Sequence, residues 1–166
     1  VHATAFVHDP LQDPIERGDG GAVYAEKRFS HTSFGVEGRY AKSPDDGRLA
    51  GGVTAKQWIA PANLLLEAEA QILRQTFDAG GHRAQIVSQL LATWFFHDGF
   101  MLDVGVSQFD EDHALANTDL EALDANVHWF ATPHWELLFT NRIQTISLGS
   151  GGASSGYSLV QIHYWL

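Results

Sequence analysis

Apolar and polar side chains alternate along this sequence with a period of two, and the pattern recurs from one end of the chain to the other. In the segment 135–146, Trp135, Leu137 and Phe139 share one face, while Glu136 and Arg142 share the other. A period of two is the spacing of a β-strand, whose successive side chains point to opposite faces of its sheet. The chain is therefore expected to form strands with one apolar and one polar face.

Ten segments carry this pattern, and we predict strands at residues 2–9, 22–30, 33–42, 48–59, 63–75, 83–96, 100–109, 121–131, 135–147 and 157–166. The segment 63–77 is also rich in good helix formers, so a helix stays open there. Together the segments predict an all-β protein with an antiparallel up-and-down sheet of about ten strands. Residues 1–166 would form a single β-barrel domain or one segment of a larger barrel.

The connections between these segments fall into two alternating sets. Those of the first set, such as 11–21, 78–82 and 110–119, are polar, acidic or rich in glycine, and we expect mostly long loops there, including a flexible one over 149–156. Those of the second set, at 30–33, 60–62, 97–99 and 132–134, are tight. Because every second turn of an up-and-down sheet lies at the same end, this alternation predicts a transmembrane β-barrel.

Aromatic residues gather near the tight turns. A ring of aromatic side chains at one level anchors a barrel at the boundary with the lipid headgroups. The residues expected to do this are Trp58, Phe96, Phe100, Trp129, Trp135, Tyr164 and Trp165.

The last ten residues, YSLVQIHYWL, alternate up to Leu166 and resemble the closing strand of bacterial outer-membrane β-barrel proteins. That strand most often ends in Phe or Trp in the family, so Leu166 departs from its pattern. The segment 126–146, two strands joined by a tight turn that contains Pro133, is similar to the end of large porin-like barrels, including those of porin–cytochrome complexes. The resemblance implies a bacterial outer-membrane location in a lipid bilayer. It also implies recognition of the C-terminal strand by the barrel-assembly machinery, and a periplasmic or lumen-docked protein partner such as a multihaem cytochrome.

If the apolar face meets lipid, the polar face lines the barrel interior. The residues expected to line the lumen are Glu67, Glu69, Gln71, Asp103, Asp124, Asn126, His128, Glu136, Arg142, Gln144 and His163. They either pair across a narrow lumen and fill it, or line a passage in which the acidic members favour cations. The expected function is a porin-like channel for solutes or a scaffold for a guest protein.

Composition excludes several other classes. A formal net charge of −10 opposes binding to nucleic acid, and the lack of cysteine removes thiolate metal sites. The nine histidines show no ligand cluster, so we expect no metal and no cofactor. Hydrolase, zinc-protease and phosphate-loop motifs are absent, so we expect no enzyme. His113 beside Asp110 is the one catalytic candidate at the rim, and a solvated acidic loop explains it better.

Two alternatives stay open. A soluble all-β ligand- or carbohydrate-binding module would turn the same apolar face inward, and solubility without detergent would distinguish it. An outer-membrane barrel enzyme would need a histidine at the rim together with a nucleophile.

Overall fold

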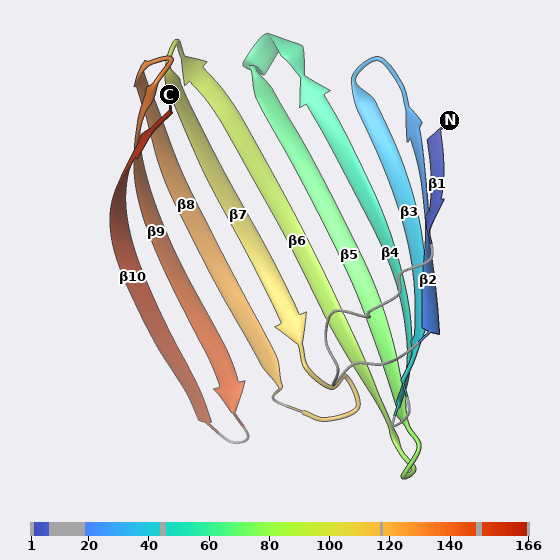
Figure 1. Cartoon of the computed structure of the whole chain (residues 1–166). Coiled ribbons are helices and arrows are strands. Elements are labelled where there is room, and N and C mark those ends of the chain that lie inside the picture. The colour runs from blue at the N-terminus through green and yellow to red at the C-terminus, as the bar shows by residue number, and fades with distance from the viewer. Residues whose placement is uncertain (1, 7–18, 44–45, 117, 149–150, 166) are drawn as a thin grey trace.

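The computed structural model describes residues 2–6, 19–43, 46–116, 118–148 and 151–165 (Figure 1). Its elements are β1 (His2–Phe6), β2 (Asp19–Arg28), β3 (Thr32–Lys42), β4 (Asp46–Ile59), η1 (Ala60–Ala62), β5 (Leu64–Phe77), β6 (His82–His97), β7 (Phe100–Asp110), β8 (Asp119–Thr132), β9 (Trp135–Leu148) and β10 (Gly151–Tyr164). Each strand pairs antiparallel with the next strand of the chain. The predicted up-and-down sheet is therefore confirmed.

The helix formers of β5 do not make a helix. Leu64–Phe77 pairs along its length with β4 on one side and β6 on the other. These two ladders, together with the alternation of side chains between the faces, outweigh the weak intrinsic preference of the segment for a helix. The strand prediction for this segment is confirmed.

The flexible loop predicted over 149–156 is wrong for residues 151–156. β10 begins at Gly151, and the segment pairs with β9 from Leu148 to Ile143. Backbone hydrogen bonds to a long neighbouring strand fix these glycine and serine residues, whose composition alone is typical of a loop. The predicted segments at 7–9 and 11–18 and the residues 149, 150 and 166 lie outside the described residues.

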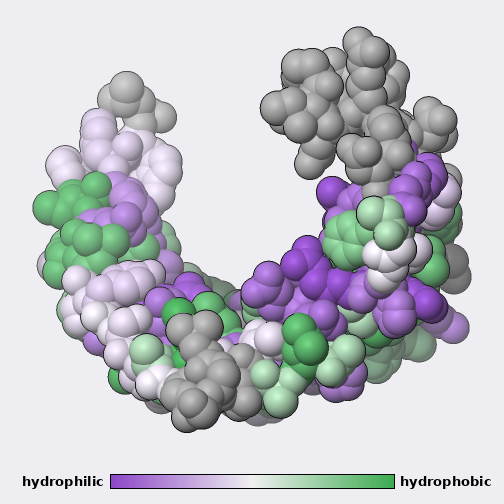
Figure 2. All heavy atoms as spheres, turned by 90° about the horizontal axis from the view of Figure 1, so that it is seen from below, coloured by the Kyte–Doolittle hydropathy of each residue, from purple (hydrophilic) through white to green (hydrophobic). Residues whose placement is uncertain are grey.

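The sheet bends into an open arc when it is viewed end-on (Figure 2). β1 pairs only with β2 and β10 only with β9, so among the described residues the two edges do not meet. The connection between β5 and β6 spans only residues 78–81, because these strands extend into the loop expected there. The fold is thus a partial barrel wall with an inner, concave face and an outer, convex face.

The described residues of this single layer form no hydrophobic core. Its accessible surface is 11429 Å², whereas a compact protein of this mass exposes about 8,100 Å². The one buried apolar side chain among the described residues is Ala122. In the same part of the chain, no helix has the length and apolar character of a membrane span. Stability must therefore come from the hydrogen bonds between the strands and from the surroundings that contact the two faces of the sheet.

The short turns are tied to one another by backbone hydrogen bonds. The carbonyl oxygen of His31 accepts from the amide of Trp58, and that of Asn63 accepts from Phe95. The same contact recurs from Phe130 to Gly99 and from Trp165 to His134. The short turns thus follow β2, β4, β6 and β8. Each of the first three accepts a bond from the end of the strand two further along the chain, and the last accepts one from the residue just after β10. These bonds link the short turns, which lie at the upper end of the strands in Figure 1, from β2 to β10.

Candidate functional site: the concave polar face

The strand register decides which side chains share a face, because directly opposed residues of an antiparallel pair point the same way. Lys56 faces Glu67 across β4 and β5, and Asp103 faces Asn126 across β7 and β8. Carried across the sheet, the register places every residue predicted to line the lumen on one face. These residues are Glu67, Glu69, Gln71, Asp103, Asp124, Asn126, His128, Glu136, Arg142, Gln144 and His163. Hydrophilic residues gather along the inner side of the curve in Figure 2. Whether this face lines a lumen stays a prediction.

Basic side chains on the concave face contact carboxylates. Lys56 forms an ion pair with Glu67, and Nε of Arg142 lies 3.6 Å from Oδ1 of Asp124. Within single strands the pairs are Arg28–Glu26, Arg39–Glu37 and Arg48–Asp46. The basic groups of these pairs on the concave face therefore each neutralise a carboxylate.

The same face carries more carboxylates than basic groups in the described residues. The acids are Glu26, Glu37, Asp46, Glu67, Glu69, Asp103, Asp124 and Glu136, and the bases are Arg28, Arg39, Arg48, Lys56, Arg83 and Arg142. Glu69 accepts a hydrogen bond from the amide of Gln71, and Asp103 and Glu136 contact histidines. With neutral histidines this leaves an excess of two negative charges.

Four titratable residues from β7 to β10 form a hydrogen-bonded row near the short turns, which we call the histidine–carboxylate row. Nε2 of His128 lies 3.0 Å from Oδ2 of Asp103, and its Nδ1 lies 2.5 Å from Oε1 of Glu136. Nδ1 of His163 lies 2.7 Å from the other oxygen of Glu136, Oε2. Glu136 is buried, at 7% exposed. The row joins residues that are 60 positions apart in the sequence, so no local spacing could reveal it.

Five of the predicted membrane anchors form an outer aromatic set at the short-turn end. Phe100 stacks on Trp129 with 5.9 Å between ring centroids, and Phe96 lies 5.8 Å from Phe100. Trp135 and Tyr164 lie 4.8 Å apart on the neighbouring strands β9 and β10. The register gives these rings the face opposite to the polar residues. Their role as anchors stays a prediction.

Trp58 and Trp165, the other two predicted anchors, lie on the concave side. Trp58 shares the face of Lys56, two residues earlier in β4, and its ring meets Phe95 edge-on at 5.9 Å. Trp165 meets the ring of His163 at 6.1 Å, on the concave side. The prediction follows the position of these residues along the strands, near the tight turns. Their role as anchors also stays a prediction.

The catalytic candidate at the rim lacks the geometry of a nucleophile with its base. Nδ1 of His113 lies 2.9 Å from Oδ2 of Asp110, and the hydroxyl of Thr118 donates to Oδ1 of the same carboxylate. The imidazole and the hydroxyl thus share a partner, whereas a catalytic pair needs a bond between them. The described residues show no such bond, and no group of three or more histidines and acids there could hold a metal ion.

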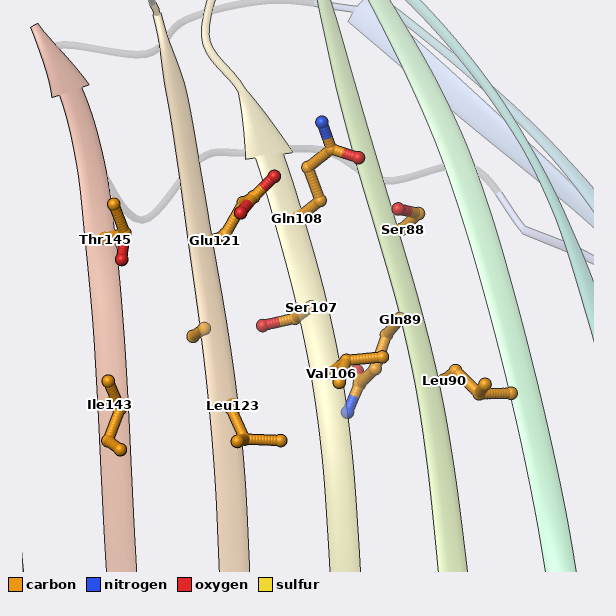
Figure 3. A pocket seen from close by; sticks show the side chains of 11 residues that line it. Ser88, Gln89, Leu90, Val106, Ser107, Gln108, Glu121, Leu123, Ile143 and Thr145 are labelled. Carbon is orange, nitrogen blue, oxygen red and sulfur yellow. The ribbon is translucent and has the colours of Figure 1, made fainter. Parts of the chain in front are cut away.

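An open hollow of about 480 Å³ lies across β6 to β9, and Figure 3 shows the side chains that line it. The register places most of its lining side chains on the convex face. These are Ser88, Leu90, Val106, Gln108, Glu121, Leu123, Ile143 and Thr145. The hollow therefore belongs mainly to the convex face, not to the concave face.

Two solved structures share this architecture. Outer-membrane expressed OmpT of Vibrio cholerae superposes with a TM-score of 0.79 at 10% identity, over 98% of this chain and 60% of that chain. The fold is that of an outer-membrane β-barrel. An anion-selective porin from Comamonas acidovorans superposes on this barrel fold with a TM-score of 0.64 at 14% identity, over 89% of this chain and 47% of that chain. No family model and no curated protein matches the sequence.

The exclusion of an enzyme is corrected by this comparison. It was wrong to exclude an enzyme because motifs of other enzyme folds are missing, since those motifs do not test a barrel. The likeness to OmpT at 10% identity carries the fold alone and gives no sign of enzymatic status. The exclusion therefore does not stand, and no activity is assigned in its place.

Proposed function

We propose that this chain forms part of the wall of a pore in the bacterial outer membrane. The observation that carries the proposal is the contrast between the two faces. On the convex face Val53 is 56% exposed, Ile72 51% and Val160 61%, with no layer of described residues over them. A surface of this kind is unfavourable in water and suits the hydrocarbon of a bilayer. A soluble module would need a second layer here, so the membrane barrel is the better interpretation.

Closure of the sheet is the second requirement of the proposal. Hydrocarbon offers no hydrogen-bond partners, and each unsatisfied backbone group in it costs several kcal/mol. β10 has 14 residues and, among the described strands, only β9 as a neighbour. The chain spans 60% of one structural relative and 47% of the other. We therefore propose that further strands close the wall between β10 and β1, and that the ten strands are one segment of a larger barrel.

The excess of carboxylates on the concave face favours cations over anions in such a pore. Glu69 contributes most directly, because its carboxylate contacts an amide and no basic side chain among the described residues. The porin from Comamonas acidovorans is anion-selective, so the two proteins would differ in the sign of their interior charge.

Planar-bilayer recordings of the complete protein in a potassium chloride gradient test the proposal. We expect discrete conductance steps and a reversal potential of the sign that cation preference gives. Glu69→Gln should reduce this preference. Glu121→Gln, the same change on the convex face, should leave it unaltered. A membrane that stays silent, or a pore that prefers anions, would refute the proposal.

Two partners belong to the proposal as well. The alternating pattern of β10 and its open edge suit recognition by the barrel-assembly machinery. Replacing Ile162 by Asp would break this pattern, and loss of the protein from the outer membrane of cells would support the interaction. A docked multihaem cytochrome stays a prediction, since no described contact bears on it.

A further inference from the structure

We infer that Asp103, His128 and Glu136 form a proton-binding site on the concave face. The three residues together hold one proton more than two ionised carboxylates and a neutral imidazole would carry. The inference goes beyond the proposed pore and does not depend on it.

The geometry of His128 carries the argument. Both of its ring nitrogens lie within hydrogen-bond distance of carboxylate oxygens, at 3.0 Å from Asp103 and 2.5 Å from Glu136. A neutral imidazole has one N–H donor and one lone pair, and an ionised carboxylate only accepts. One of the two contacts would then set a lone pair against a negatively charged oxygen. An additional proton, on the imidazole or on one of the acids, makes both contacts attractive.

Apart from His163, which contacts Glu136, the described neighbours of these carboxylates carry no positive charge. From β6, the uncharged and buried Thr93 faces Asp103. From β7 and β9, the apolar Met101 and Leu138 face His128. On β8 the ring of Phe130 stacks on that of His128 at 6.2 Å.

The remaining titratable groups are already engaged. His163 on β10 contacts Glu136, and the next charged pair along the face is Asp124 with Arg142. Oδ1 of Asp103 is buried without a hydrogen-bond partner among the described residues. A proton is therefore the cation that the described residues leave for this site.

Release of the proton would change both the structure and the charge of this region. One of the two bonds that link β7, β8 and β9 through His128 would be lost. The concave face would gain one negative charge near the short turns. In a pore, cation preference would consequently rise with pH.

Nitrogen-15 NMR of the histidines and carbon-13 NMR of the carboxyl groups test the site directly in the complete protein in lipid nanodiscs. The signal of His128 is assigned by its loss in His128→Gln. At pH 7.5 we expect either a His128 ring with both nitrogens protonated or a protonated acid at position 103 or 136. A neutral ring beside two ionised carboxylates would overturn the inference.

Two variants sharpen the test. In Glu136→Gln the new amide can donate to Nδ1 of His128 while Nε2–H donates to Asp103, so the extra proton is no longer needed. We expect a neutral His128 and an ionised Asp103 at pH 7.5 in this variant. His163→Gln removes a histidine of the row outside the site and should keep the extra proton. An extra proton retained in Glu136→Gln, or lost in His163→Gln, would contradict the proposed site. These spectra report on the site whether or not the protein conducts.

Discussion

Arg142 of β9 lies directly across the sheet from Asp124 of β8, with 3.6 Å between Nε and Oδ1 on the concave face. The side chains are 32% and 28% exposed, so water screens their attraction. Such a pair contributes at most about 1 kcal/mol to stability. Its importance would be electrostatic, because each partner cancels one interior charge.

Removing the partners singly should move ion selectivity in opposite directions. Asp124→Asn leaves Arg142 uncompensated and should shift the reversal potential toward anions. Arg142→Gln should shift it toward cations, and the double variant should return close to the wild type. A reversal potential that is unchanged in both single variants would mean that this face does not border the ion path.

A charge on the convex face should impair membrane insertion far more than the same charge on the concave face. Val104 is 40% exposed near the middle of the outer surface, whereas Ser107 of the same strand shares the inner face with Gln89. Val104→Arg should cost about 2–4 kcal/mol of folding free energy in lipid. Ser107→Arg is the matched control and should cost much less. Refolding yield into liposomes measures both, and equal losses would reverse the assignment of the faces.

The β6–β7 turn should tolerate substitution less well than the β5–β6 turn. Gly99 and Gly80 both have positive φ, at 75° and 94°. A Cβ at Gly99 would lie 2.9 Å from the carbonyl oxygen of Phe130, whereas nothing lies within 4 Å of one at Gly80. Gly99→Ala should therefore destabilise the protein by about 1–2 kcal/mol more than Gly80→Ala. Urea unfolding in lipid compares the two variants, and equal costs would rule out the close approach to Phe130.

Tryptophan fluorescence should separate the two aromatic sets. Among single-tryptophan variants, the one that keeps Trp129 should be quenched strongly by brominated lipid, because this ring lies in the outer set. The one that keeps Trp58 should respond more to an aqueous quencher, because this residue shares the face of Lys56. Identical responses of the two variants would argue against a sheet with one lipid face.

Alternation alone predicts the strands and divides their residues between the faces. Glu67 and Arg142, from distant segments, lie on the expected common face because the side-chain period of a strand leaves no other option. The period also identifies β5 in spite of its helix formers. It fails at Gly151–Gly156, where glycine and serine carry no hydropathy contrast to read.

The histidine–carboxylate row depends on information that alternation does not contain. Alternation assigns His128, Glu136 and His163 to the polar sides of their own strands, but their contacts require the pairing of Glu136 with His163 and the turn between β8 and β9. Counting outward from the tight turn at 132–134 would have brought Glu136 close to His128, whereas its contact with His163 follows from the pairing of β9 with β10. Similarly, the sequence shows that Trp58 lies near a tight turn. Its face follows only from its spacing of two residues from Lys56.

The backbone bonds between the short turns repeat from one hairpin of the wall to the next. Phe95, Phe130 and Trp165 donate to the preceding turns and follow one another at intervals of 35 residues. Each hairpin thus supplies a donor to the hairpin before it and an acceptor to the one after it. A wall built in this way can lengthen by duplication of whole hairpins, because each new turn still finds a hydrogen-bond donor and each new strand end an acceptor. Loss of a single strand would instead leave one carbonyl and one amide without a partner.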